Sequence, residues 1–174
     1  MAIFISDKID FNPKVTIKRN TEGHYIILKR VVQQEKNIAI VNTYTVNIGA
    51  HKYIKNILED FRKGIHSNTL IVGDFNTPFP TMDKFSTQKL NKDIAALNDT
   101  LDQMDLINIR KTFCPKEVKY TFFLNAYGSF SKIDHMVGHK TSLNKFKKFK
   151  IISSIFSDHN YLKLETNTKE GARW

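Results

Sequence analysis

The sequence predicts a single α/β domain in which sheets are covered by helices. Strand-like and helix-like segments alternate along the 174 residues without a linker or an internal repeat, and this length suits one domain. Residues 38–44 form a nearly continuous apolar run, which is typical of a strand buried on both faces. Such a mixture requires sheets packed against helices. We expect the domain to cover residues 1–166, followed by a polar tail over residues 167–174.

Two helices are predicted from apolar residues that recur at helical spacing. The first covers residues 51–63 and is followed by Gly64, which is placed to end it. The second runs from about residue 91 to residue 107. The strands are predicted from β-branched and aromatic content or from short apolar runs, over residues 3–6, 25–32, 38–44, 69–73, 120–123, 133–137, 146–152 and 161–165.

The charge balance of the chain indicates an anionic partner. Lysine and arginine outnumber aspartate and glutamate by 27 to 17, which gives a formal net charge of +10. Such a surface favours a polyanion, because neutralising phosphates releases condensed counterions. An anionic membrane would also attract it, but no segment has the roughly 20 apolar residues that span a bilayer. The single cysteine, Cys114, excludes an internal disulfide framework and suits a reducing intracellular compartment, the nucleus or the cytoplasm.

The most informative motif follows the apolar strand over residues 69–73. Strand periodicity places Asp74 and Asn76 on one side of the chain and Phe75 in the core. A carboxylate can activate a water molecule, and a neighbouring amide can orient that water or a phosphoryl oxygen. A polar turn closed by Pro78 explains the same residues equally well.

Two further acidic segments are candidates for the same site. Asp134 interrupts a good strand, which costs stability unless its carboxylate has a defined partner. Asp158 and His159 stand at the head of another strand, where residues are commonly positioned for function. Asp134 can hold the imidazole of His159 in one orientation, as carboxylates do for catalytic histidines. For Lys132 and His135 we expect a solvated strand face instead.

Tyr44 and a basic segment have two interpretations each. Tyr44 can donate its hydroxyl to a phosphate, or it can be a core tyrosine with a satisfied hydroxyl. Residues 144–150 interleave lysines with Phe146 and Phe149, a combination that can hold a nucleic-acid backbone and stack bases. An edge strand with its lysines in water explains the segment as well. We prefer that interpretation, with a diffuse contribution to DNA affinity.

Several motifs together resemble a known superfamily. In chain order they are Tyr-x-x-Asn at residues 44–47, Gly-Asp-Phe-Asn-Thr-Pro at 73–78, Tyr-Thr-Phe-Phe at 120–123, Ser-Lys-Ile-Asp-His at 131–135 and Ser-Asp-His at 157–159. They resemble the endonuclease/exonuclease/phosphatase superfamily. More narrowly, residues 2–164 are similar to the endonuclease domain of the LINE-1 retrotransposon ORF2 protein, which is itself similar to apurinic/apyrimidinic endonucleases.

The resemblance implies a four-layered α/β sandwich, in which two packed mixed sheets are flanked by helices and the site lies at their upper edge. It implies Mg²⁺-assisted hydrolysis that nicks DNA, with Mn²⁺ as a possible substitute. Carried over onto this sequence, Asp74 orients or deprotonates the attacking water and Asn76 positions it. Tyr44 contacts the scissile phosphate, while His159 bonds a phosphate oxygen and is oriented by Asp134.

The same resemblance implies the substrate and metal contacts. Thr121 and Ser157 lie near the DNA together with Tyr44. Asp158 and Asp74 lie beside the metal. Mg²⁺ usually takes one or two carboxylates plus waters and substrate oxygens, which suits so sparse a site.

The sequence departs from the family pattern in two places. The family begins with a strand–helix–strand segment that carries an Asn and the principal metal-binding Glu, and no such segment precedes Met1. Thr45 and Val46 also stand where the family commonly has Ala-Pro. We therefore expect a truncated copy that is weak or inactive. The alternatives are a phosphatase of the same superfamily acting on a lipid or inositol phosphate, and a non-catalytic DNA-binding or transposon-derived remnant.

Overall fold

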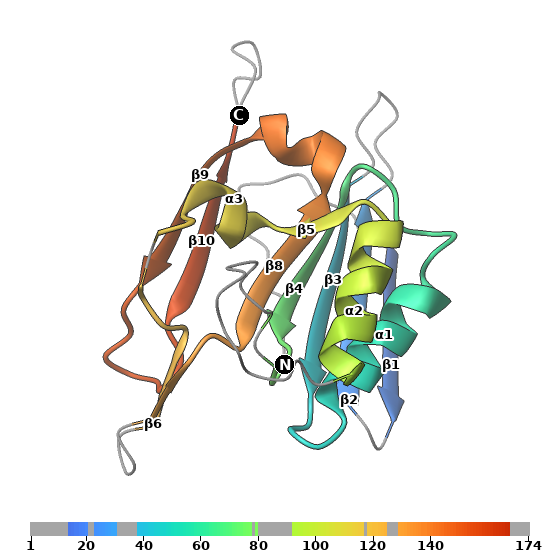
Figure 1. The fold of residues 1–174 in the computed structure, drawn as a ribbon. Helices are drawn as coiled ribbons and strands as arrows, with labels where there is room; N and C mark the ends of the chain where they lie inside the picture. Colours follow the sequence, from blue (N-terminus) through green and yellow to red (C-terminus); the bar gives the residue numbers. More distant parts are fainter. Residues whose placement is uncertain are drawn as a thin grey trace.

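A six-stranded mixed sheet forms the centre of the protein (Figure 1). The structure is a computed structural model that describes residues 14–20, 23–30, 38–77, 79, 92–116, 118–124 and 129–167. The strand order is β1-β2-β3-β4-β8-β5, in which β3 and β4 are parallel and all other neighbours are antiparallel. These strands are β1 (Lys14–Asn20), β2 (Gly23–Arg30), β3 (Ile38–Thr45), β4 (Thr69–Asp74), β5 (Leu106–Asn108) and β8 (Asp134–His139).

Helices cover one face of this sheet, and a strand pair lies on its other side (Figure 1). The α/β class predicted from the sequence is therefore confirmed. The covering helices are α1 (Ala50–Asp60) and α2 (Lys92–Gln103). The remaining elements are α3 (Ile109–Phe113), the hairpin of β6 (Phe122–Leu124) and β7 (Ser129–Ser131), the 3₁₀ helix η2 (Lys140–Lys145), and the antiparallel pair β9 (Phe146–Ile152) and β10 (Tyr161–Thr166).

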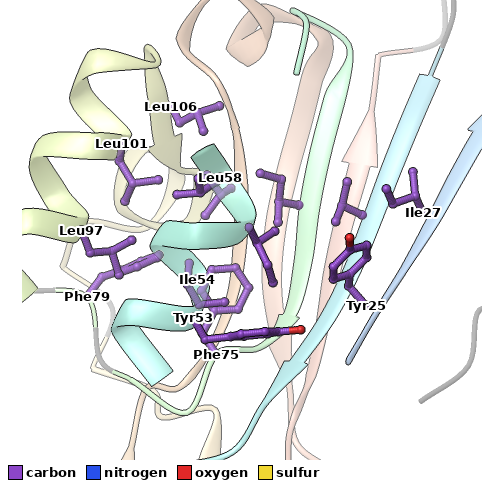
Figure 2. Close-up of a cluster of buried hydrophobic side chains, with 14 residues drawn as sticks. Tyr25, Ile27, Tyr53, Ile54, Leu58, Phe75, Phe79, Leu97, Leu101 and Leu106 are labelled. Carbon is purple, nitrogen blue, oxygen red and sulfur yellow. The ribbon is translucent and has the colours of Figure 1, made fainter. Parts of the chain in front are cut away.

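The larger hydrophobic core lies between the helices and the sheet (Figure 2). Tyr53, Ile54, Ile57 and Leu58 are all buried, because their spacing places them on one side of α1. Burying each such side chain stabilises the fold by roughly 1.5–3 kcal/mol. They meet a common set of buried residues from α2, the strands and the segment after β4: Tyr25, Ile27, Val41, Ile71, Phe75, Phe79, Leu97, Leu101, Leu106 and Val137.

A second core lies between the sheet and β9–β10. Ile109, Phe149 and Ile151 are buried there, with Leu70 and Met136 packed against them. Leu70 and Met136 neighbour Ile71 and Val137 of the larger core, so β4 and β8 supply side chains to both cores. This two-sided burial accounts for the short apolar run that predicted the strand over residues 69–73.

Some element boundaries differ from the prediction. The second helix ends at Gln103, because Asp105 has a positive φ of 52° and the chain then enters β5. Strand β1 was not predicted, and the strand expected over residues 3–6 lies outside the described residues. The strand predicted over residues 25–32 is observed as Gly23–Arg30, with residues 31 and 32 outside the described residues, while the one over residues 146–152 is confirmed as β9.

The expectation of a solvated His135 is wrong. This side chain is 2% exposed, and its Nε2 donates to the Thr77 carbonyl at 2.8 Å while Nδ1 accepts from Asn108 Nδ2 at 2.9 Å. Burial lowers the pKa of His135 to about 3, so the ring stays neutral at physiological pH. Lys132, for which a solvated strand face was also expected, is only half-buried, and its Nζ lies 5.4 Å from the centroid of the Tyr120 ring. Within the described part of the chain, no helix has the length and apolar character needed to cross a membrane.

Gly73 is required where β4 approaches β3. Its φ is +135°, and a Cβ built there would lie 1.9 Å from the Thr43 carbonyl oxygen. That contact is with backbone, which cannot move aside without disturbing the pairing of β3 with β4.

Gly73→Ala is therefore expected to lower the free energy of unfolding by about 3 kcal/mol or more, through steric overlap and strain at positive φ. Gly49→Ala is the matched control, because Gly49 has a φ of +78° but no atom within 4 Å of the added Cβ. It should cost about 1 kcal/mol. Denaturant unfolding measures both, and equal losses would contradict this account.

Candidate active site

Three neighbouring strands bring polar side chains into one row at the edge of the main sheet. Tyr44 of β3 is in register with Asp74 of β4, and Asp74 is in register with Asp134 of β8. Partners in register on neighbouring strands point to the same face. Tyr44 is 41% exposed, so it is not a core tyrosine. The carboxylates of Asp74 and Asp134 are each 16% exposed.

His159 completes this row from the segment before β10. Its Nδ1 lies 2.9 Å and 3.1 Å from the two carboxylate oxygens of Asp134. Because a carboxylate accepts, Nδ1 carries the proton, and Nε2 is directed toward Asp74 Oδ2 at 4.0 Å. The ring also packs 4.9 Å from the ring of Phe122, whose backbone forms a β-bridge with His159. The orienting contact expected between Asp134 and His159 is thus present.

The segment that carries His159 is held by Asn160. The backbone N–H of Asn160 donates to the Thr121 carbonyl at 2.7 Å, and its Nδ2 donates to the Tyr120 carbonyl at 2.9 Å. Its side-chain oxygen accepts from the Ser154 N–H at 3.0 Å. Sequence reasoning missed Asn160, because an asparagine in a polar loop carries no signal that its partners lie on another segment.

Thr121 is a buried residue that holds the start of β8 through its hydroxyl. It is 0% exposed, and its hydroxyl oxygen accepts from the backbone N–H groups of Ile133 and Asp134, both at 3.0 Å. The same hydroxyl bonds the Asp134 carboxylate. Thr121 therefore fixes the start of β8 and the Asp134 side chain, and its burial removes it from direct contact with a substrate.

Asn76 forms a polar turn after β4, and the same turn places it beside Asp74, so both interpretations of the motif over residues 73–78 apply. Its backbone N–H donates to Asp74 Oδ1 at 2.9 Å, and its side-chain Nδ2 donates to the Thr45 carbonyl at 2.6 Å. Its φ of 46° lies in the left-handed region, which asparagine tolerates better than most residues. The turn thus holds Asp74 in place and brings Asn76 beside it.

The electrostatics of the row disfavour two bare carboxylates. Burial raises the pKa of Asp74, and the charge of Asp134 adds to that rise, while the Asn76 N–H and His159 oppose it. Burial also raises the pKa of Asp134, opposed by its bonds to His159 and Thr121. A cation placed here would relieve both costs.

The donor groups present fit a hard divalent cation. Among the described residues, Asp74, Asp134 and His159 offer ligand atoms that all lie within 4.8 Å of one another. Both oxygens of Asp134 already accept from His159, whereas Asp74 Oδ2 receives a longer bond of 3.5 Å from Asn76. Asp74 is thus the carboxylate best placed to bind an ion.

Asp158 and Ser157 lie at the exposed rim of the site. Ser157 Oγ donates to Asp158 Oδ1 at 3.3 Å and accepts from the His159 N–H at 3.1 Å. The Asp158 carboxylate is outside the 4.8 Å group, but its charge contributes to the raised pKa of Asp74. It is therefore near enough to act on a cation held by Asp74.

A comparison with models of protein families finds no match, but solved structures match over most of the chain. A variant of the 3′ phosphatase NExo from Neisseria, bound to a product DNA hairpin, has a TM-score of 0.69 and 17% identity, covering 91% of this chain and 72% of that one. The chain has the endonuclease/exonuclease/phosphatase fold.

Two further structures with this endonuclease/exonuclease/phosphatase fold widen the comparison. An AP endonuclease from Archaeoglobus fulgidus has a TM-score of 0.65 and 16% identity, covering 91% of this chain and 72% of that one. The endonuclease domain of TRAS1, a telomere-specific non-LTR retrotransposon, has a TM-score of 0.66 and 12% identity, covering 91% and 70%. The narrower resemblance to LINE-1 stays a prediction.

Thr121→Val is expected to destabilise the protein, because it leaves the buried N–H of Ile133 and the partly buried N–H of Asp134 without their acceptor. Thr121→Ser keeps the hydroxyl and is the control. We expect the Val variant to be less stable than the Ser variant by about 1–2 kcal/mol in denaturant unfolding. Equal stability of the two variants would show that the hydroxyl does not hold β8.

Asp74→Asn is expected to preserve or raise the melting temperature at pH 7 in EDTA. The raised pKa of Asp74 means that the folded protein binds this proton more tightly than the unfolded chain, so stability falls as pH rises above 3.8 toward the folded value. The amide removes that cost, and its benefit should vanish below pH 3.8, where Asp74 is protonated in both states.

The control for this substitution is Asp99→Asn, at an exposed position of α2. Calorimetry of both variants across pH measures the difference. A melting temperature for Asp74→Asn that falls well below that of Asp99→Asn at pH 7 would contradict the expected sign.

Proposed function

We propose that this protein is a metal-dependent phosphodiesterase that nicks DNA. The observation that carries the proposal is the convergence of Asp74, Asp134 and His159 from three separate segments into one group. His159 is held by Asp134 through Nδ1, so that Nε2 faces the space above Asp74. A carboxylate base beside an oriented imidazole is an arrangement suited to moving protons at a phosphate.

The roles of the residues follow from this geometry. A phosphodiester binds over the row, where the Nε2 edge of His159 contacts a non-bridging oxygen. Asp74 takes a proton from the attacking water, as a carboxylate within reach of that water can. The water oxygen bonds to phosphorus as the opposite P–O bond breaks, and the leaving oxygen is protonated from solvent.

The surrounding groups position the substrate. Asp134 and buried Thr121 hold His159 in place, which assigns Thr121 a positioning role in place of the substrate contact expected from the sequence. Exposed Tyr44 supplies a hydroxyl beside Asp74 for the phosphate. Mg²⁺, or Mn²⁺ in its place, would be held by Asp74 with Asp158 nearby, and would neutralise charge on the phosphate.

DNA is the proposed substrate for two reasons. The net charge of +10 favours a polyanion over a small phosphate ester. The structures that share this fold include proteins described as a 3′ phosphatase bound to a DNA hairpin, an AP endonuclease and a retrotransposon endonuclease domain. With the motifs of the sequence, this favours a nicking enzyme of the LINE-1 retrotransposon type.

Nicking of supercoiled plasmid tests the proposal. The chain is expected to convert supercoiled to open-circular DNA slowly with Mg²⁺ or Mn²⁺, in keeping with the weak activity expected from the sequence, and to lose this activity in EDTA. Asp74→Ala and His159→Ala should each reduce the rate by about 100-fold or more, because the first removes the base that takes the proton from water and the second removes the side chain that contacts the phosphate. Asp99→Ala, on an exposed face of α2, should leave the rate unchanged.

Three results of the nicking assay would contradict the proposed function. Cleavage that persists in Asp74→Ala and His159→Ala would place the chemistry elsewhere or in a contaminant. DNA binding without cleavage under either ion would contradict an enzyme and favour a non-catalytic DNA-binding protein. Release of phosphate from a 3′-phosphorylated oligonucleotide, without nicking, would indicate a phosphatase.

A further inference from the structure

The side of β9–β10 that faces away from the main sheet is exposed and basic. Phe149 and Ile151 of β9 are buried against the second core, at 3% and 4% exposure. Their strand neighbours therefore point outward. Lys148 and Lys150 of β9 and Lys163 of β10 are all exposed on that side. We call the outward side chains Lys148, Lys150, Lys163 and Tyr161 the basic face.

The pairing register concentrates this charge. Lys150 lies directly opposite Lys163, and like charges in opposite positions on paired strands are destabilising. Glu165 lies opposite Lys148 and forms an ion pair of 3.1 Å with Lys163. Three lysines and one glutamate leave two net positive charges on four neighbouring positions. A bound anion would offset the repulsion that the free protein carries there.

The basic face is continuous with the candidate active site. Tyr161 begins β10 two positions after His159 and pairs with Ile152 at the end of the strands. Both side chains are exposed, Tyr161 at 55% and Ile152 at 43%. Figure 1 shows β10 running from the end of the molecule where β4 ends and β8 begins toward the opposite end. The lysines therefore follow the tyrosine along a path that leads away from the site.

The dimensions suit a nucleic-acid backbone. From Tyr161 to Glu165 the strand extends about 13 Å, at roughly 3.3 Å for each residue. Phosphates of one DNA strand advance by 3.4 Å along the helix axis for each nucleotide, so this length matches about four base pairs. Lysines at alternate positions can each reach a phosphate, and an exposed tyrosine can pack against sugar or base.

We propose that the basic face binds the phosphate backbone of the DNA that flanks the bond held in the candidate active site. This inference rests on the proposed function for the position of the DNA, but the binding itself requires no chemistry. It differs from the sequence-based interpretation of residues 144–150 as solvated lysines, because only the structure places Lys163 and Tyr161 on the same face.

The test measures binding of a short labelled DNA duplex by fluorescence anisotropy in EDTA, over roughly 50–200 mM salt. The double variant Lys150→Gln/Lys163→Gln should reduce the slope of log affinity against log salt by about 1.8, or about 0.9 for each lost phosphate contact. Binding near 0.1 M salt should weaken by roughly tenfold or more. Glu165→Gln should tighten binding, because it removes the opposing charge.

The matched control is Lys52→Gln/Lys63→Gln, which removes the same charge from exposed positions in and just after α1. These positions lie across the main sheet from β9–β10 (Figure 1). The control should lose little of the salt slope. Equal slopes for the two double variants would overturn the proposal, since the effect would then be one of net charge. Lysine-dependent binding to phosphatidylserine vesicles, with no change in DNA binding, would assign the face to a membrane instead.

Nicking kinetics separate this inference from the proposed function. If both hold, Lys150→Gln/Lys163→Gln should raise KM for plasmid and leave kcat within about twofold, whereas Asp74→Ala should lose kcat and keep the salt slope. If no variant nicks but the salt slope still depends on Lys150 and Lys163, the basic face stands and the proposed function fails. If nicking depends on Asp74 while the slope is unaffected by the lysines, the reverse holds. Equal thermal melts of the two double variants establish that both are folded.

Discussion

The alignment of three strands in the main sheet determines where Tyr44, Asp74 and Asp134 lie, and these residues form the row to which His159 is added. Parallel pairing of β3 with β4 sets Tyr44 beside Asp74, and antiparallel pairing of β4 with β8 sets Asp74 beside Asp134. A slip of one residue would turn each of these side chains to the other face of the sheet. Gly73 enforces the alignment, since the Thr43 carbonyl occupies the space that any side chain would need. Strand pairing and backbone packing therefore set the relative positions of these three residues without help from their polar contacts.

The polar contacts hold the side chains of the row in place, but burying the two carboxyl groups costs folding stability. Burial raises the pKa of both carboxyl groups, so their ionised forms are unfavourable in the folded protein. At Asp134, hydrogen bonds to buried Thr121 and to the imidazole of His159 partly offset this effect of burial. Asp74 receives less support, because the bond from Asn76 Nδ2 to its Oδ2 is long, at 3.5 Å. A carboxyl group whose ionised form is disfavoured and incompletely hydrogen-bonded is prepared for a substrate or an ion.

Three of the candidate residues chosen from the sequence lie together in the structure, whereas several of the elements between them were predicted less well. Asp74, Asp134 and His159 interrupt apolar strands or stand at their ends, which made each one visible, and the α/β class followed from the apolar runs. His135 was misjudged because its partners Asn108 and Thr77 are 27 and 58 positions away. The buried, positioning role of Thr121 depends on contacts that exist only in three dimensions. Strand β1 carries three basic residues and an asparagine among its seven, a composition that resembles a polar loop.

The wide separation of the three central residues has a consequence for how the protein matures. Asp74 and Asp134 meet across 60 positions of sequence, and His159 follows another 25 positions later. Contacts between residues so far apart in the sequence form slowly, because closing a long loop costs chain entropy before the contacts can stabilise the fold. During synthesis from the N-terminus, the group of three cannot assemble until His159 has been made and has left the ribosome. A partly folded or prematurely ended chain would therefore carry the basic charge that attracts nucleic acid without the means to act on it.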